Sequence, residues 1–299
     1  MSAKSKDRDP AERFLSKRQG GVLIKSPRIY YARKRLKLVS QLLRRLKKGA
    51  EIRRHFGVSK SVYEKYTDWE MRIYEHGSRI TFNRGRMDRV SFKEIRAYYL
   101  APIIEHIEAL HRADPSRPVE VLEVGCGNGT NLMILKGALG DAVRLRGIDV
   151  SPERIKLGYE YWGDAVEGVE MQVDSATVLE TQADGSADLV YSVHCLEQIP
   201  YAVDACIESI ERVTRSKAVF VEPTWELANT TQRLYTLFGD QLRTLIPTLE
   251  GSGLEIVSST KAELLAHPLN QTGIVVARLP RATATRADRR RRPSPESAG

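Results

Sequence analysis

The stretch Val121-Leu-Glu-Val-Gly-Cys-Gly-Asn-Gly-Thr-Asn-Leu132 decides the fold, because a strand-like apolar run ends there in a glycine-rich turn. Gly125, Gly127 and Gly129 allow the positive φ angles and the close backbone approach that a tight turn beneath a ligand requires. A helix is expected to begin directly after the turn, so that its first N–H groups also face the ligand. The pattern therefore predicts a strand, a turn and a helix that hold a nucleotide-like cofactor.

The turn departs from the pattern of dinucleotide-binding proteins in two ways. Their Gly-x-Gly-x-x-Gly or Ala fingerprint needs a small residue at position 130, where this chain has Thr130. Glu123, two residues before the first glycine, would repel a pyrophosphate but suits a cofactor that carries a cationic amine or sulfonium. A nicotinamide dinucleotide is therefore disfavoured as the cofactor.

The segment Val143-Arg-Leu-Arg-Gly-Ile-Asp-Val-Ser-Pro152 predicts a second strand that ends in Asp149. Ser151 and Pro152 are typical of the N-cap and the first position of a helix. A carboxylate at the tip of the second strand can accept hydrogen bonds from both hydroxyl groups of a ribose. Asp149 is therefore the predicted ribose-binding residue.

With these residues the chain resembles the class I S-adenosylmethionine-dependent methyltransferases. The resemblance rests on the Glu-x-Gly-x-Gly-x-Gly turn at 123–129, the acids at 149 and 174, and the fourth-strand segment at 188–200, and it covers residues 117–279. It implies an α/β fold: a Rossmann-like, seven-stranded, mostly parallel sheet with helices on both faces, whose last strand is antiparallel, plus an N-terminal helical extension.

The resemblance also implies S-adenosyl-L-methionine as the cofactor. The glycines of the turn would admit its backbone, Asp174 would accept from the adenine amino group, and groups near Ser192 would meet the methionine amine. Asp174 could instead be an exposed turn acid. The predicted cofactor-binding residues are Glu123, Gly125, Cys126, Gly127, Gly129, Asp149, Val150, Asp174, Ser175 and Ser192. No metal ion is expected.

Methyl transfer from a sulfonium requires alignment of nucleophile and methyl group, exclusion of water, and removal of a proton where the nucleophile carries one. His194, next to Glu197, is the first catalytic candidate, because the ordinary pKa of imidazole suits a general base. The family pattern His-x-Leu-Glu-His has Gln198 as its last residue here, which disfavours paired imidazoles. Glu222, expected at the active-site mouth after the fifth strand, would hold an amine or hydroxyl of the acceptor. Both side chains could also be structural.

Strand-like and helix-like segments alternate between residues 119 and 279, which predicts a parallel sheet with crossover helices. Strands are expected near 119–124, 143–149, 169–173, 188–193, 217–222, 253–259 and 273–279, and C-terminal helices near 225–250 and 261–266. Ligands bind at the carboxyl ends of strands in such sheets, and every motif above lies at such an end.

The chain divides into four predicted parts: a weakly ordered N-terminus (1–27), a helical extension (28–112), the cofactor domain (113–279) and a basic tail (280–299). Residues 28–56 show the spacing of a basic amphipathic helix. Residues 59–112 predict two or three further helices, the last kinked or started at Pro102.

Charge is distributed unevenly along the 299 residues, whose formal net charge is +9. Residues 1–112 hold 28 Lys and Arg against 12 Asp and Glu, whereas residues 113–279 hold 13 against 24. Because the cofactor domain is acidic, the overall charge is no argument for a nucleic-acid substrate. We expect the basic helix to pack on the domain, with contact to an anionic membrane or to nucleic acid as the alternatives.

The cellular setting is predicted to be the cytoplasm. The sequence has no long apolar run that would span a membrane and no leader-like segment at its start. Its three cysteines, Cys126, Cys195 and Cys206, have neither disulfide-framework nor zinc-site spacing.

The favoured function is transfer of a methyl group to a small-molecule or lipid-like acceptor. The methyl group would be attached to an oxygen, a nitrogen or a carbon atom of the acceptor, and the sequence does not identify which. Methylation of RNA or protein is the alternative among enzymes. Methylation of nucleic-acid bases is disfavoured, because related base methylases present an Asn-Pro-Pro-Tyr-type tetrapeptide where this chain has Ser192-Val-His-Cys195. A catalytically silent, cofactor-binding regulatory or scaffold protein is the alternative of a different class.

Overall fold

A seven-stranded sheet forms the centre of the protein, in the order β5-β4-β3-β6-β7-β9-β8. The computed structural model describes residues 27–48, 76–239 and 241–280. The strands are β3 (Val119–Val124), β4 (Val143–Asp149), β5 (Val169–Val173), β6 (Ala187–Val193), β7 (Thr214–Pro223), β8 (Glu255–Lys261) and β9 (Thr272–Arg278). β9 runs antiparallel to both of its neighbours, and the pairs from β5 to β7 are parallel. The predicted Rossmann-like sheet with an antiparallel last strand is confirmed.

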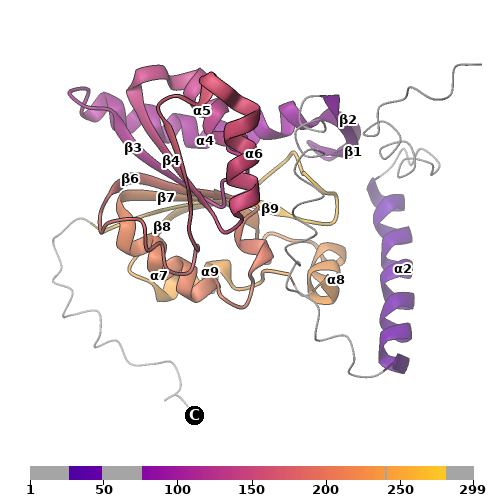
Figure 1. Ribbon diagram of the computed structural model, residues 1–299. Coiled ribbons are helices and arrows are strands. Elements are labelled where there is room, and N and C mark those ends of the chain that lie inside the picture. The colour runs from indigo at the N-terminus through magenta and orange to yellow at the C-terminus, as the bar shows by residue number, and fades with distance from the viewer. Residues whose placement is uncertain (1–26, 49–75, 240, 281–299) are drawn as a thin grey trace, which may run out of the picture.

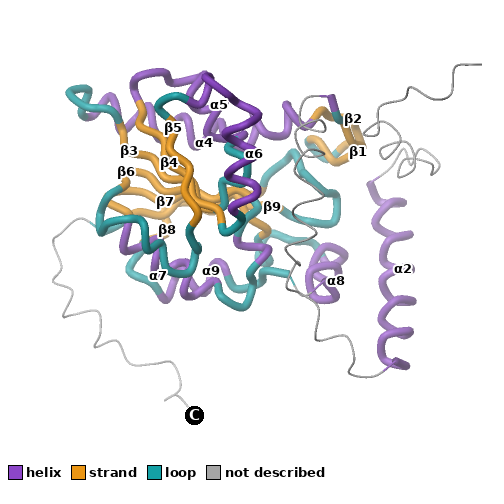
Figure 2. Tube along the Cα trace, viewed as in Figure 1, coloured by secondary structure: helices purple, strands orange, loops and turns teal. Residues whose placement is uncertain are grey.

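Helices cover both faces of this sheet, as Figures 1 and 2 show. One face carries α4 (Phe92–Ala113), α5 (Thr130–Leu139) and α6 (Pro152–Trp162), and the other carries α7 (Val203–Val213) and α9 (Leu245–Gly251). Successive strand residues point to opposite faces, so Val121 belongs to the first apolar core and Leu122 to the second. Short 3₁₀ turns lie at Gly140–Ala142, Gly163–Val166 and Leu196–Gln198.

Two helices that form part of the site begin at well-defined caps. The Ser151 side chain accepts a hydrogen bond from Arg154 N and Pro152 follows at the first helical position, as predicted for α6. α4 begins with a capping box between Ser91 and Glu94, which the sequence analysis did not use. Pro102 lies inside α4 and does not start it, so the predicted helix start there is wrong.

A β-hairpin replaces part of the predicted N-terminal helices. Its strands are β1 (Ser78–Asn83) and β2 (Arg86–Ser91), which pair antiparallel. The two turn residues, Arg84 and Gly85, have φ of 48° and 74°, the positive values that fit the twist of a two-residue hairpin. The prediction of helix was therefore wrong for 78–91, and residues 59–75 lie outside the described residues.

The C-terminal part also differs from expectation. The predicted helix over 225–250 is divided into α8 (Thr230–Gly239) and α9, and the one predicted at 261–266 is absent. Residues 262–271 instead form a loop that pairs with the hairpin and with β9. Leu265 N donates to Phe82 O at 3.1 Å and Ala262 N donates to Thr272 O at 3.0 Å. These tertiary hydrogen bonds outweigh the local helix propensity of the segment.

The basic helix α2 (Pro27–Lys48) lies beside α8 (Figure 1). Tyr31 Oη donates to Pro268 O at 3.1 Å, Arg35 Nε donates to Thr231 Oγ1 at 2.5 Å, and Leu38 is buried. Residues 49–56 of the predicted helix, the predicted N-terminus up to residue 26 and the tail from residue 281 lie outside the described residues. Among the helices that the structure describes, none combines the length and apolarity needed to cross a membrane.

Candidate functional site

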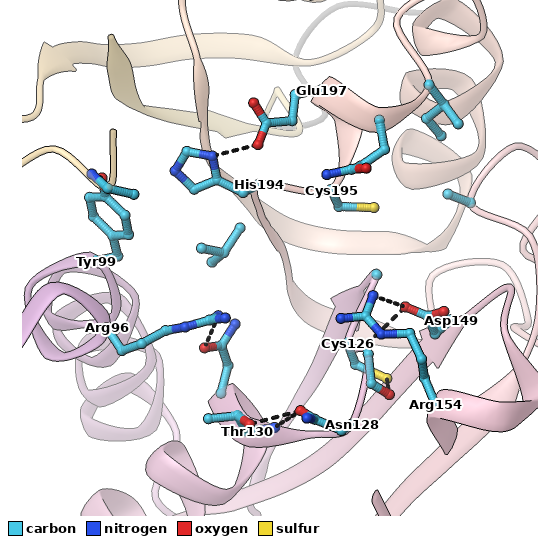
Figure 3. A pocket seen from close by; sticks show the side chains of 18 of the residues that line it. Arg96, Tyr99, Cys126, Asn128, Thr130, Asp149, Arg154, His194, Cys195 and Glu197 are labelled. Atoms are coloured by element: carbon cyan, nitrogen blue, oxygen red, sulfur yellow. Dashed lines mark hydrogen bonds and ion pairs between the residues drawn. The ribbon is translucent and has the colours of Figure 1, made fainter. Parts of the chain in front are cut away.

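A cavity of about 670 Å³ opens at the carboxyl ends of β3, β4 and β6. Its volume lies within the usual range for small-molecule sites. One wall comes from the glycine-rich turn and the residues after β4 and β5, and the opposite wall from α4 and the loop 262–271. Figure 3 shows Asp149 and Arg154 on one side of the cavity and Arg96, Tyr99 and His194 on the other.

The glycine-rich turn is packed so closely that side chains would not fit. Gly125 and Gly129 both have φ of 77°. A Cβ on Gly125 would lie 2.6 Å from Cβ of Cys195, and one on Gly129 would lie 2.5 Å from Sδ of Met171. Gly125 N and Cys126 N both donate to Ile148 O at 2.8 Å, which ties the turn to the end of β4. Glycine is therefore required both for backbone conformation and for packing.

Asp149 is held at the tip of β4 with its carboxylate at the cavity wall. Oδ2 accepts from Gly127 N and Oδ1 accepts from Ser151 N, each at 2.9 Å. Arg154 Nη1 lies 3.7 Å from Oδ2. Because a carboxylate offers about four acceptor sites, it can still receive hydroxyl donors. Val150, also at the wall, is 68% exposed and offers an apolar surface beside it.

Glu123 lies one layer behind the wall and does not line the cavity. Its carboxylate accepts from Asn131 Nδ2 at 2.6 Å and from Tyr191 Oη at 3.0 Å. Arg96 Nη1 in turn donates to Asn131 Oδ1 at 2.8 Å. Burial raises the pKa of Glu123 to about 7. Glu123 therefore orients Asn131 and Arg96, which do line the cavity.

Asp174 and Ser192 are placed away from the cavity wall. The Asp174 carboxylate accepts from Thr181 N, Thr181 Oγ1, Ser175 N and Glu180 N, so it ties its own loop together. The Ser192 side chain is fully buried in β6. The predicted cofactor-binding residues that line the cavity are Gly125, Cys126, Gly127, Asp149, Val150 and Ser175, and those that do not are Glu123, Gly129, Asp174 and Ser192.

His194 lines the cavity directly after β6, in a left-handed backbone conformation with φ of 53°. Its Nδ1 lies 2.9 Å from Glu197 Oε1 and its Nε2 lies 3.1 Å from Thr272 Oγ1. The Tyr99 ring lies 5.5 Å from the imidazole, centroid to centroid. Burial alone would lower the pKa of His194, but the negative charges of Glu197 and Glu222 raise it above its ordinary value.

Glu197 is fixed from two sides. Besides its contact with His194, it accepts a hydrogen bond from Asn270 Nδ2 at 2.6 Å. Burial would raise the pKa of Glu197, but the charge and hydrogen bond of His194 hold it below the ordinary value. The carboxylate therefore stays ionised and orients the imidazole.

Glu222 does not reach the active-site mouth, where it was expected. It is fully buried under the turn after β6 and is absent from the cavity lining. Oε1 accepts from Cys195 N at 2.9 Å and from Leu196 N at 3.1 Å. Burial raises the pKa of Glu222 to about 7. Val193 of β6 pairs with Val221 of β7, so Glu222 follows directly on the neighbouring strand and supports the turn that carries His194.

Sequence reasoning expected the N-terminal extension to act as a cap but did not name the residues that line the cavity. Phe92, Ile95, Arg96 and Tyr99 of α4 all line the cavity. Their spacing of three, four and seven residues places them on one face of the helix, and this signal was readable in the sequence. Arg79 of β1 also lines the cavity and lies 4.9 Å from the centre of the Phe92 ring. A hairpin had not been predicted, so nothing had placed Arg79 there.

Known proteins are similar to this chain in sequence and in fold. Residues 121–217 match the family described as "Methyltransferase domain". Ajmaline N-methyltransferase of Rauvolfia serpentina is 34% identical over 113 residues, which are 36% of this chain. The match spans 37% of the length of that relative.

Two solved structures share the fold at low sequence identity. The [4+2]-cyclase SpnF has a TM-score of 0.55 at 16% identity, over 74% of this chain and 95% of its own. A Galdieria sulphuraria protein assigned as a sarcosine dimethylglycine methyltransferase has a TM-score of 0.54 at 13% identity, over 72% of this chain and 98% of its own.

The sheet order and the glycine-rich turn define a protein of the class I methyltransferase fold. Residues 121–217, which match the methyltransferase-domain family, lie within this fold and contain its glycine-rich turn. S-adenosylmethionine is the cofactor of this family. The site fits it, because the cavity combines a glycine cradle, a carboxylate at Asp149 that can accept hydroxyl donors and an apolar surface at Val150.

Proposed function

We propose that this chain transfers a methyl group from S-adenosylmethionine to a small-molecule or lipid-like acceptor. One observation carries the proposal: the cofactor motifs form one wall of the cavity, and α4 with the loop 262–271 forms the opposite wall. A chamber of about 670 Å³ bounded in this way suits cofactor and a compact acceptor better than an RNA or protein chain. Bound cofactor supplies an electrophilic methyl group on a cationic sulfur.

The residues of the first wall would hold the cofactor at three points. Asp149 would accept the ribose hydroxyls, and Val150 would cover the adenine, with Ser175 at its edge. Arg96, held by Asn131, would bind the methionine carboxylate, because a guanidinium matches a carboxylate in a bidentate manner. The predicted adenine contact of Asp174 would need its loop to rearrange, since the carboxylate accepts four hydrogen bonds from that loop.

His194 would serve as the group that takes a proton from the acceptor. Its imidazole lies at the cavity wall between Tyr99 and Glu197, and Glu197 orients it through Nδ1. The Nε2 atom, next to Thr272 Oγ1, would receive the proton. A sulfonium in the cavity would disfavour protonated His194 by like-charge repulsion, which lowers its pKa and leaves more of the basic form.

The alternatives differ in what they predict for turnover. A catalytically silent scaffold would bind cofactor and methylate nothing, and an RNA or protein methyltransferase would use macromolecular acceptors. The cyclase SpnF shares the fold, which illustrates that the fold alone does not define the reaction.

The proposal is tested by calorimetry and by labelling. S-adenosylmethionine should bind and NAD should not. Methyl-labelled cofactor incubated with the protein and host extract should label compounds that pass a small-pore filter, and a His194→Ala variant should not produce them. Label retained with RNA or protein, or cofactor binding without any label transfer, would overturn the proposal.

A further inference from the structure

The acceptor half of the cavity has more basic side chains than carboxylates. Arg79 and Arg96 line it together with the imidazoles of His194 and His267. His267 Nδ1 accepts a hydrogen bond from Leu269 N at 3.2 Å, which leaves its Nε2 as a donor. The carboxylate on this side is Glu197, which His194 and Asn270 already engage. Bound cofactor would pair its carboxylate with Arg96, as proposed above, and would add the positive charge of its sulfonium. An acceptor of opposite charge would compensate this field, whereas a cationic acceptor would meet repulsion.

Arg79 is held in place by three parts of the chain. It comes from β1, its guanidinium lies over the Phe92 ring of α4, and its Nη1 donates to Ala266 O in the loop 262–271. Thr81, two residues further along β1, fixes the same loop by donating from Oγ1 to Leu265 O at 2.5 Å. The guanidinium is therefore positioned before any ligand binds, which reduces the entropic cost of binding.

Arg79 and Arg96 lie next to each other on the wall. Phe92, which the Arg79 guanidinium covers, is four residues before Arg96 on α4, and residues so spaced are neighbours on a helix surface. Arg96 is committed to Asn131, and in the proposed function it binds the methionine carboxylate of the cofactor. Arg79 lies farther along the wall, beside Ala266 and its neighbour His267.

We infer that the acceptor is a carboxylic acid with an apolar body, and that Arg79 and His267 form the subsite for its carboxylate. Phe92 and Tyr99 line the cavity beside Arg79 and Ala266 and would contact the apolar body. This inference rests on the proposed function, because it describes the substrate of the same site. It adds a specificity-determining residue, Arg79, that lies outside the cofactor-binding motifs.

Matched probes test this inference with the protein loaded with S-adenosylhomocysteine. Benzoate, its neutral analogue benzamide and phenylphosphonate are titrated by ligand-observed NMR. Benzoate should bind about tenfold or more tightly than benzamide, the scale of a charge-assisted hydrogen-bond pair. Arg79→Gln should abolish most of this preference, and Arg79→Lys should retain part of it. Arg89→Gln, on the same hairpin but outside the cavity lining, should leave it unchanged.

The outcomes separate this inference from the proposed function. Affinity for S-adenosylhomocysteine, measured by calorimetry, should be the same in the wild type and in the Arg79 variants. Equal binding of benzoate and benzamide, no binding of either probe, or a benzoate preference that survives in Arg79→Gln would overturn the inference. Clearly tighter binding of phenylphosphonate than of benzoate would overturn the assignment to carboxylates. Failure to bind S-adenosylhomocysteine at all would instead overturn the proposed function.

Discussion

Asp149 combines two roles in one carboxylate. It fixes the glycine-rich turn through Gly127 N and α6 through Ser151 N, and it faces the cavity at the position expected for ribose hydroxyls. A backbone turn that is already tied down offers its shape to a ligand without rearrangement. The same residue is therefore expected to affect cofactor affinity both directly and through the shape of the turn.

Replacing Asp149 by Ala should weaken the binding of S-adenosylmethionine by about 1.5–3 kcal/mol, the scale of hydrogen bonds to a charged acceptor. The fold should persist, because the residue lies at a strand tip. Isothermal calorimetry measures the affinity and thermal unfolding checks the fold. Asp141→Ala, an acid before β4 that does not line the cavity, is the matched control. Unchanged affinity in a folded Asp149 variant would remove the residue from the site.

His194 was recognisable as a site residue from the sequence, because it follows a buried strand. Only one of the residues around it could be named in the same way. Glu197 lies three residues away and was named with it, whereas Thr272, Asn270 and Tyr99 come from distant parts of the chain. Contacts of this kind depend on which strands and helices become neighbours. The sequence alone does not contain that information at the level of single side chains.

Replacing His194 by Ala should lower kcat about 10²-fold or more, the usual range for a lost general base, and should leave cofactor affinity largely intact. In the wild type, kcat should rise as the pH increases through the raised pKa of His194, because only neutral imidazole accepts a proton. Glu197→Gln removes a negative charge that raises this pKa, so the rising limb should move to lower pH. Steady-state kinetics against pH would measure both effects.

A pH profile in Glu197→Gln that coincides with the wild-type profile would show that another group controls the titration. Near-normal kcat in His194→Ala would show that the imidazole is structural and that methyl transfer here depends on proximity alone.

At the scale of elements, strands were predicted far better than the segments between them. The observed β3, β4 and β5 have the predicted bounds, because β3 is an apolar run buried along nearly its whole length and β4 and β5 begin with the apolar-polar alternation of strands. The hairpin was missed because β2 buries only Val90, and among its exposed or half-buried residues only Met87 is apolar. Residues 261–266 carry a helix-like sequence, but they pair with the hairpin.

The turn after β6 depends on a carboxylate from the neighbouring strand. Glu222 of β7 accepts from the backbone N–H groups of Cys195 and Leu196, next to His194. Sequence reasoning placed this acid at the end of the correct strand but assigned it to the acceptor. The direction of a side chain at a strand end depends on the local twist and on the turn that follows, and neither could be derived from residue spacing.

The stability of this turn should therefore depend on pH. The raised pKa of about 7 means that folded Glu222 keeps its proton at pH values where the unfolded carboxyl has lost it. The folded state binds more protons in this window, so this carboxyl makes stability fall as pH rises from about 4.5 to about 7, with no further change above. Glu222→Gln lacks this carboxyl and should be less sensitive to pH across the same window.

Urea unfolding of the wild type and Glu222→Gln at about pH 5 and about pH 8 measures the difference. Glu226→Gln, an exposed acid after the same strand, serves as the control and should follow the wild type. If the wild type and Glu222→Gln show the same dependence on pH, the carboxyl is ionised in the folded protein throughout. A changed KM for the acceptor with unchanged stability would instead return Glu222 to the predicted substrate role.

Considered as a whole, the molecule separates its charges. An acidic sheet domain is joined to a strongly basic N-terminal segment, and α2 holds nine Lys and Arg and no acidic residue. Helix α2 packs beside α8 through Tyr31, Arg35 and Leu38. Its other face carries Ile29 and Leu36, which are 52% and 74% exposed. Packing and surface binding are thus both compatible with the helix, and salt distinguishes them.

We expect packing on the domain to be the main role of α2, so that activity changes little between about 0.05 and 0.5 M salt. Binding to an anionic surface would instead fall steeply over this range, because each cation that contacts the surface contributes to the salt dependence. Flotation with phosphatidylserine vesicles and retention on RNA measure association directly.

A variant with Arg28, Arg33 and Lys37 replaced by Gln removes three exposed cations, and Tyr31→Phe removes a packing hydrogen bond without changing charge. If α2 only packs, Tyr31→Phe should lower stability by about 1 kcal/mol, and the triple variant should behave like the wild type. Strong vesicle or RNA binding that vanishes at high salt and in the triple variant would show that the helix is a surface anchor.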